Sequence, residues 1–261
     1  MLAIAFIGVI QHEVAQAQLR RLLTTVKDEA GAGCVTLCNA GGLFSSAPNL
    51  ESQVSMLFDS GIDVVFSGEQ SVARSSGRSI LAASKWSLVR PLNLDDSVPG
   101  KGALLLKTPV GPLWLIALSD GTGRMQVEPA HIVLEKFFSN KTDKFPVFIN
   151  VDGTDLEYKK ALTWKHSSEG SPLIWSGTGL GYPVSLVEMD CFGSFFQPDA
   201  GSVVVDNTVG ALPPDIWWKR NIERVPVAAM PGWGALRCDY IIVRLDDQGK
   251  PRDFLQKTIR I

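Results

Sequence analysis

The side chains best suited to chemistry are one histidine and two carboxylates, His12, Glu69 and Asp152, each of which follows an apolar stretch. Imidazole and carboxylate groups serve as metal ligands and as general acids or bases. Together the three could hold one metal ion; the alternative for His12 is an ordinary loop histidine. The other two histidines, His131 and His166, belong to no motif with a partner, and we expect both on the surface.

A glycine-rich segment, residues 177–183, also follows an apolar stretch and could bind an anion. Its sequence GTGLGYP lacks the third glycine of the dinucleotide-binding pattern, and a proline stands where a helix should begin. We therefore do not expect a dinucleotide there. The backbone N–H groups of Gly177, Thr178 and Gly179 could still form a nest for an anion.

Composition and charge exclude several classes of protein. A net charge of -2 and a pI near 5.9 argue against a broad nucleic-acid-binding surface. Hydrophobic residues make up 45% of the chain, enough for a large core. No apolar run approaches the roughly 18 residues of a membrane-spanning helix, and the apolar opening run lacks the basic start of a signal peptide. Because the four cysteines form no CxxC pair either, we expect a cytoplasmic protein with no membrane segment.

Alternation of apolar and amphipathic segments predicts a parallel β/α arrangement in the first 90 residues. Continuous apolar runs suit strands buried on both faces, at residues 2–10, 35–38, 62–66 and 88–89. Apolar residues at helical spacing predict intervening helices, near residues 15–26, 50–58 and 76–84.

The rest of the chain predicts a more mixed arrangement. A hairpin spans residues 103–118, and a capping box from Thr154 to Glu157 opens a helix. Another helix is expected near residues 129–138, and strands at residues 147–151, 173–176, 203–205, 240–245 and 254–261. With no repeat or linker, we expect a single domain over residues 1–261 with a mixed αββα build.

Several strings in the same order resemble the YmdB-like branch of the bacterial calcineurin-type metallophosphoesterases. FIGV at residues 6–9 is similar to that family's FIGD, and NAGG at 39–42 to its NGEN. RPLN at 90–93 and PGKG at 99–102 match its RPAN and PGKG. GEQS at 68–71, NVDG at 150–153 and GTGLG at 177–181 stand where the family has GNHT, DFHA and GTHTH.

The resemblance implies an α/β fold, a calcineurin-like four-layer αββα sandwich, with the active site at the carboxyl ends of the strands. It also implies a phosphodiesterase with activity toward cyclic nucleotides, in which two divalent metals such as Fe or Mn activate a water. The family's ligands and catalytic histidine are replaced in this chain, by Val9, Gly41, Gly42, Glu69, Gln70, Asp152, Gly179 and Gly181.

These replacements predict a pseudoenzyme with no metal cofactor. Valine and glycine offer no side-chain ligand, and we expect open space at the four glycines. The alternative is an active phosphoesterase with an altered metal site around His12, Glu69 and Asp152. Whether the chain is an enzyme is therefore left open, with the non-catalytic interpretation favoured.

A binding, regulatory or structural role would need a ligand or a partner. A small phosphate-bearing ligand could contact residues at or near the positions of the family's active site. These candidates are His12, Asn39, Glu69, Gln70, Asp152, Gly177, Thr178 and Gly179. Adjacent tryptophans at residues 217–218, flanked by prolines, indicate a contact surface for a protein partner. Because the family tends to self-associate, we expect a homo-oligomer that uses residues 215–224.

Overall fold

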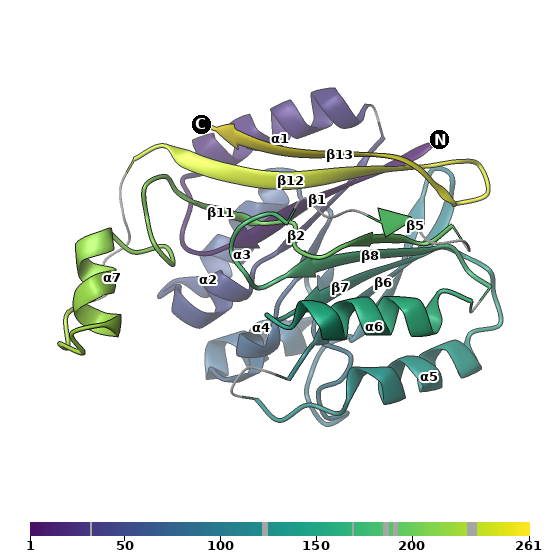
Figure 1. Cartoon of the computed structure of the whole chain (residues 1–261), viewed down its shortest axis with the longest axis horizontal. Helices are drawn as coiled ribbons and strands as arrows, with labels where there is room; N and C mark the ends of the chain where they lie inside the picture. The colour runs from purple at the N-terminus through teal and green to yellow at the C-terminus, as the bar shows by residue number, and fades with distance from the viewer. Residues whose placement is uncertain (32, 122–124, 169, 185–187, 190–192, 229–233) are drawn as a thin grey trace.

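The computed structural model describes residues 1–31, 33–121, 125–168, 170–184, 188–189, 193–228 and 234–261. Within these ranges the chain forms two β-sheets packed face to face, with helices on both outer faces (Figure 1). The four-layer αββα sandwich expected from the sequence is therefore confirmed.

One sheet has seven strands in the described part of the chain, in the order β13-β12-β11-β1-β2-β3-β4. Its centre is parallel, as the alternating pattern predicts, while β12 runs antiparallel to β1, β11 and β13. The strands are β1 (Leu2–Ile10), β2 (Val35–Asn39), β3 (Val64–Phe66), β4 (Leu88–Val89), β11 (Ser202–Val205), β12 (Leu236–Leu245) and β13 (Pro251–Arg260).

The other sheet has six described strands in the order β5-β6-β7-β8-β10-β9. Its four central strands are parallel, and the edge strands β5 and β9 pair antiparallel with their neighbours. The strands are β5 (Ala103–Thr108), β6 (Gly111–Ser119), β7 (Val147–Asp152), β8 (Leu173–Thr178), β9 (Glu188–Met189) and β10 (Phe195–Gln197).

Helices cover the two outer faces because their apolar stripes pack on the sheets. The seven-stranded sheet is covered by α1 (Gln16–Ala30), α2 (Gly41–Ser46), α3 (Leu50–Asp59) and α4 (Ser75–Ala83). The six-stranded sheet is covered by α5 (Ala130–Asn140) and α6 (Leu156–His166). A 3-10 turn, η1 (Glu69–Val72), follows β3. No helix in the described ranges combines the length and hydropathy needed to cross a membrane.

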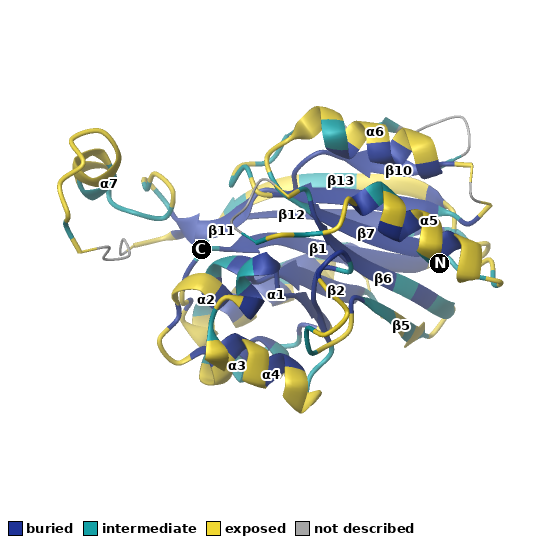
Figure 2. Ribbon diagram, turned by 90° about the horizontal axis from the view of Figure 1, so that it is seen from below, coloured by how far each residue is buried: buried dark blue, intermediate teal, exposed yellow. Residues whose placement is uncertain are grey.

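The space between the sheets is filled by apolar side chains from both. The strands that face this space are coloured as buried along most of their length in Figure 2. Phe6 of β1 packs edge-on against Phe148 of β7, with ring centroids 5.3 Å apart. Phe66 of β3 stacks on the same Phe148 ring at 5.9 Å. These contacts fix the two sheets face to face, so the carboxyl ends of β1–β3 and β6–β8 lie at one edge of the sandwich.

Two local predictions are wrong. The cap of α6 is Asp155 rather than Thr154, because the Asp155 carboxylate accepts a hydrogen bond from the Tyr158 N–H at 2.9 Å. His166 is fully buried rather than on the surface. It lies in the last turn of α6, with its ring 5.5 Å from that of Phe138 and 6.5 Å from that of Trp175. The polar side chain of His166 predicted exposure to solvent, but its position on the side of α6 that packs on the sheet places it in the core.

The helix α7 (Pro214–Asn221) stands away from both sheets at one end of the molecule (Figures 1 and 2). None of its residues is buried. It lies in a long excursion between β11 and β12, although these two strands are direct neighbours and Val205 pairs with Leu236. The pairing of β11 with β12 therefore does not require the residues of the excursion between them.

Candidate functional site

Buried amides join the two sheets at the edge where the parallel strands end. Asn39, the last residue of β2, donates through Nδ2 to Asn150 Oδ1 at 3.1 Å and to Thr178 Oγ1 at 3.0 Å. Its own Oδ1 accepts from the Gly41 N–H at 2.8 Å, at the start of α2. Asn39 and Thr178 are fully buried. Asn39 therefore acts as a bridge between the layers, with its side-chain groups already occupied.

The Thr178 hydroxyl connects this bridge to Asp152. It accepts from the Asn39 and Asn150 amides and donates to Asp152 Oδ1 at 3.0 Å. A hydroxyl has one proton and two lone pairs, so these three bonds use its full capacity. Of the residues proposed from the sequence, Asn39, Asp152 and Thr178 are thus brought into one network.

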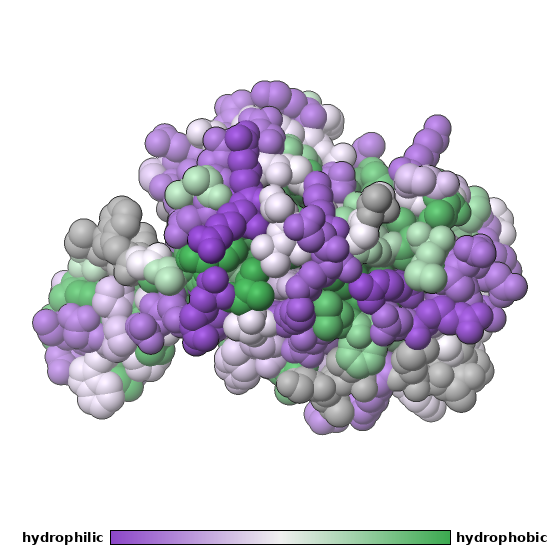
Figure 3. All heavy atoms as spheres, turned by 90° about the horizontal axis from the view of Figure 1, so that it is seen from above, coloured by the Kyte–Doolittle hydropathy of each residue, from purple (hydrophilic) through white to green (hydrophobic). Residues whose placement is uncertain are grey.

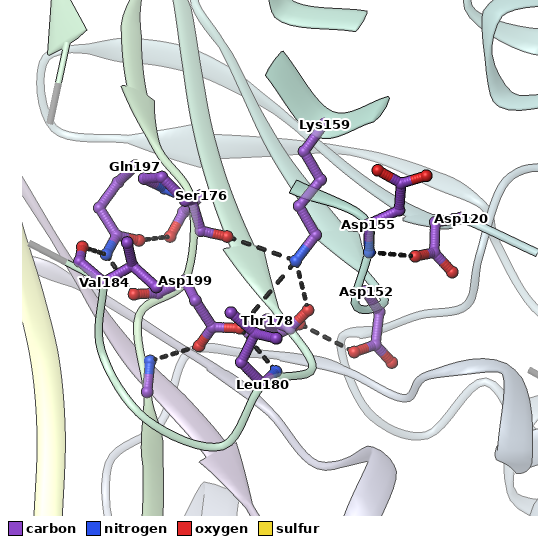
Figure 4. A network of polar contacts seen from close by, with 12 residues as sticks. Asp120, Asp152, Asp155, Lys159, Ser176, Thr178, Leu180, Val184, Gln197 and Asp199 are labelled. Carbon is purple, nitrogen blue, oxygen red and sulfur yellow. Dashed lines mark hydrogen bonds and ion pairs between the residues drawn. The ribbon is translucent and has the colours of Figure 1, made fainter. Parts of the chain in front are cut away.

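A buried ion pair lies beside the network, and sequence reasoning missed it (Figure 4). Lys159 of α6 donates to the carbonyl oxygen of Thr178 at 2.8 Å and to that of Pro198 at 3.3 Å. Its Nζ lies 4.0 Å from Asp199 Oδ2, and both side chains are at most 1% exposed. Asp199 in turn accepts from the N–H groups of Leu180 and Gly201, each at 2.8 Å.

This arrangement fixes the loop that follows β8. Lys159 holds the carbonyl at the end of β8, while Asp199 holds the Leu180 N–H just after it. The N–H groups of Gly177, Thr178 and Gly179 were expected to be able to form a nest for an anion, and Leu180 is the next residue along this loop. The Leu180 N–H is instead committed to a carboxylate of the same chain, so it is not available to a bound anion.

Glu69 and Gln70 form a second small cluster in η1. Glu69 is 6% exposed, and its carboxylate accepts from the Ser119 hydroxyl at 2.9 Å and from Gln70 Nε2 at 3.1 Å. Ser119 is the last residue of β6, so this contact also joins the two sheets. The Glu69 carboxylate is therefore hydrogen-bonded within the protein, as Asp152 is.

Burial controls the charges at this edge. It raises the pKa of Asp152 above its ordinary value, although the hydrogen bond from Thr178 and the charge of Lys159 oppose that rise; the charges of Glu69 and Asp120 add to it. Burial likewise raises the pKa of Asp199 to about 6 and lowers that of Lys159. Four carboxylates near a single buried ammonium give the edge an acidic character.

The glycines in place of family ligands do not all leave open space, and that expectation is wrong at two positions. A Cβ built on Gly42 would lie 2.6 Å from the Gln11 Cα and the Ile10 carbonyl oxygen. A Cβ on Gly179 would lie 2.2 Å from the Gly153 carbonyl oxygen, and its φ of +125° disfavours any side chain. Backbone atoms occupy the space into which ligand side chains would project.

The space differs among Gly41, Gly181, Val9 and the neighbouring Gly177. A Cβ on Gly41 would lie 3.1 Å from Asn39 Oδ1 and 3.7 Å from Asp152 Oδ2. Gly181 has more room, with Gln11 Nε2 at 3.8 Å, but its φ is +79°. Val9 is buried at the end of β1 and presents methyl groups in place of a carboxylate. Gly177 is tightly packed, since a Cβ there would lie 1.7 Å from the Pro198 carbonyl oxygen.

His12 lies apart from the network. It is 6% exposed, and its Nε2 accepts from the Val205 N–H at 3.3 Å, at the end of β11. Burial lowers its pKa, which favours the neutral imidazole that this bond requires. It is therefore neither a loop histidine in solvent nor a neighbour of the two carboxylates in a shared site.

The residues present do not fit a dinuclear metal centre. Such a centre needs a bridging carboxylate and several imidazoles, and valine and glycine stand at those positions. Across the described ranges, no three His, Cys, Asp or Glu side chains gather into a group that could hold a metal ion. His12, Glu69 and Asp152 all lie in those ranges and do not form such a group, which argues against the altered metal site that the sequence offered as the alternative.

Similar solved structures share this fold at low sequence identity. A hypothetical protein from Thermus thermophilus is 18% identical with a TM-score of 0.85, over 99% of each chain. A structure described as a novel phosphatase from Mycoplasma pneumoniae is 16% identical with a TM-score of 0.85, over 100% of this chain and 93% of that one. A 5'-nucleotidase precursor, also from Thermus thermophilus, is 13% identical, with a TM-score of 0.55, over 99% of this chain and 54% of that one.

These neighbours confirm the calcineurin-like four-layer αββα fold of this chain. No match was found among curated proteins. A family model described as YmdB-like protein matches residues 5–254, which is nearly the whole chain. The resemblance drawn from the short sequence strings is thereby confirmed: this chain belongs to the YmdB-like family.

Proposed function

We propose that this chain is a non-catalytic member of the YmdB-like family that works by binding a partner. The observation that carries the proposal is the packing at Gly42 and Gly179, where backbone atoms lie 2.6 Å and 2.2 Å from the Cβ positions. Hydrolysis by this family's chemistry needs ligands to project from those positions toward two metal ions. A chain that has closed the space around its former ligands has adapted to a role without them.

The charge of the edge favours a protein partner over a small phosphate-bearing ligand. Without metal ions, the carboxylates of Glu69, Asp152 and Asp199 would repel a phosphate. The buried ammonium of Lys159 at this edge already donates to two carbonyl oxygens and faces Asp199. The former site therefore contributes stability through its hydrogen bonds, and recognition falls to other surfaces of the molecule.

The test combines metal analysis with a phosphodiesterase assay. Purified protein is dialysed, its Mn and Fe content is measured, and hydrolysis of bis(p-nitrophenyl) phosphate is followed with each metal added. We expect less than one transition-metal ion per chain and a rate that is the same for the wild type and Asp152→Ala. Two metal ions per chain, together with hydrolysis abolished by Asp152→Ala, would overturn the proposal. An active metallophosphoesterase assayed in parallel verifies the conditions.

A further inference from the structure

A small hollow at the amino end of β4 differs in charge from the mixed surface that Figure 3 shows. The former site lies where the parallel strands end, so this hollow is at the opposite end of β4. Its volume of about 190 Å³ is below the roughly 300–1,000 Å³ of pockets for drug-sized ligands, and it suits a small chemical group. It is lined by Leu81, residues 84–88, Gly100, Lys101 and Leu104.

Two cationic side chains and no carboxylate belong to this lining. Lys85 and Lys101 are both exposed, and within the described ranges neither ammonium group forms a hydrogen bond or an ion pair. The Lys85 ammonium lies 4.4 Å from the centre of the Trp86 ring, which also lines the hollow. This contact holds one of the two charges beside the hollow.

The carboxyl end of α4 adjoins the hollow, and the dipole of that helix acts against a bound anion. Ser84, which lines the hollow, is the residue that follows the last turn of α4. A helix dipole places roughly half a negative charge at the carboxyl end. The two lysines bring two full positive charges, so the hollow keeps a net positive charge.

Two hydroxyl groups add hydrogen-bond donors to the hollow. Ser84 and Ser87 line it, and neither hydroxyl has a hydrogen-bond partner in the part of the chain that the structure describes. Ser84 has a left-handed backbone, with φ of +50° and ψ of +24°. Glycine is the favoured residue after a helix in this conformation, so a serine there indicates a role for its side chain.

The string PGKG at residues 99–102, which the proposed function does not use, supplies the opposite wall. Gly100 has a φ of +94°, and a Cβ there would lie 3.2 Å from the Leu81 Cβ of α4. The Lys101 carbonyl oxygen accepts from the Arg90 N–H at 2.9 Å. The fold therefore fixes the backbone of Lys101 beside the hollow and leaves its ammonium group available.

We propose that this hollow binds a phosphate monoester, with the ammonium groups of Lys85 and Lys101 and the nearby serine hydroxyls on the phosphate oxygens. A phosphate monoester has a charge of about −1.5 to −2 at pH 7 and three strong acceptor oxygens. Two ammonium groups and two hydroxyls match that charge and those acceptors, whereas a carboxylate has a single charge. The phosphate belongs either to a phosphorylated segment of a protein partner or to a free small molecule.

NMR titration of ¹⁵N-labelled protein with inorganic phosphate, at constant pH and ionic strength, tests the site. The indole N–H signal of Trp86, assigned with Trp86→Phe, should shift and saturate at millimolar phosphate. The signal of Trp164 on α6, which is 81% exposed, should not move. Lys85→Gln and Lys101→Gln should each weaken binding about tenfold.

Lys107→Gln is the matched control for charge. Lys107 is exposed on β5 but does not line the hollow, so its replacement should leave phosphate binding unchanged. The absence of any shift at Trp86 would overturn the proposal. So would a loss of affinity in Lys107→Gln as large as that in Lys101→Gln, because phosphate would then respond only to the overall surface charge.

Two further probes distinguish the sources of the phosphate. A phosphoserine peptide that binds more tightly than inorganic phosphate, while its unphosphorylated form does not bind, would support a protein partner. Glucose 6-phosphate binding more tightly than the peptide would support a free small molecule. The protein source rests on the proposed role in partner binding, whereas the phosphate site itself does not. Failure at this site would leave the metal and hydrolysis tests of the proposed function unaffected.

Discussion

Adjacent glycines at the start of α2 provide a direct test of whether the former ligand positions are closed. Both are helical, and neither has a positive φ, so Gly41→Ala and Gly42→Ala are equivalent in backbone conformation. They differ in what the new methyl group meets. At Gly41 the nearest atom is the Asn39 side-chain oxygen at 3.1 Å, whereas at Gly42 it is backbone of Gln11 and Ile10 at 2.6 Å.

The sizes of the competing effects can be estimated. Replacing glycine by alanine in a helix favours folding by up to about 1 kcal/mol. Inserting a methyl group into close-packed surroundings costs about 1–3 kcal/mol, and the upper end applies where backbone must move. Gly41→Ala should therefore change the free energy of unfolding by less than about 1 kcal/mol. Gly42→Ala should lower it by about 2 kcal/mol.

Urea unfolding followed by circular dichroism measures both variants against the wild type. For a chain of this size, about 2 kcal/mol corresponds to a fall in Tm of roughly 4–8 °C. Equal stability of the two variants would refute the reasoning, because it would mean that the space beside Gly42 is as open as that beside Gly41. A full ligand side chain could then be restored there without moving the backbone of Ile10 and Gln11, at the end of β1.

Two further predictions concern the buried ion pair. Lys159→Met leaves Asp199 as an uncompensated buried charge and should cost about 3–5 kcal/mol in urea unfolding at neutral pH. The neighbouring Lys160→Met, which removes an exposed pair with Glu188, should leave the free energy of unfolding nearly unchanged. Because folding raises the pKa of Asp199 from 3.8 to about 6, the folded state binds that proton more tightly, and the Asp199 contribution to stability falls as pH rises through this window. Asp199→Asn should remove that fall, and identical pH profiles of the unfolding midpoint in the two proteins would contradict the assignment.

The layers of the fold follow from the sequence because strands and helices differ in their apolar periodicity. The parallel strands β1–β4 and the helices α1 and α3 lie where continuous and stripe-like apolar patterns predict them. Apolar periodicity does not predict short or fully exposed elements. The six-residue α2 is too short to show a helical period, and α7 has no buried side to produce one.

The candidate site was predicted less completely, for a reason that Lys159 illustrates. A lysine in an amphipathic helix is ordinarily taken as a surface residue. The signal was in its spacing, because Lys159, Leu162, Thr163 and His166 recur at helical intervals and form the buried side of α6. The partner Asp199 lies forty residues further along the chain, and no local pattern connects the two. The sequence therefore pointed to Asn39, Asp152 and Thr178 at this edge but not to Lys159 or its partner Asp199.

The connection between β11 and β12, which carries α7, leaves and re-enters the sheet where Val205 pairs with Leu236, and this has a consequence for the integrity of the chain. Lys219, Arg220 and Arg224 are exposed there, so trypsin should cut the backbone between β11 and β12. The C-terminal fragment carries β12, which stays paired with β1 along Leu2–Ile7, with β11 and with β13. A nicked molecule should therefore remain in one piece under native conditions. The same position divides the protein into two parts that could be produced separately and recombined.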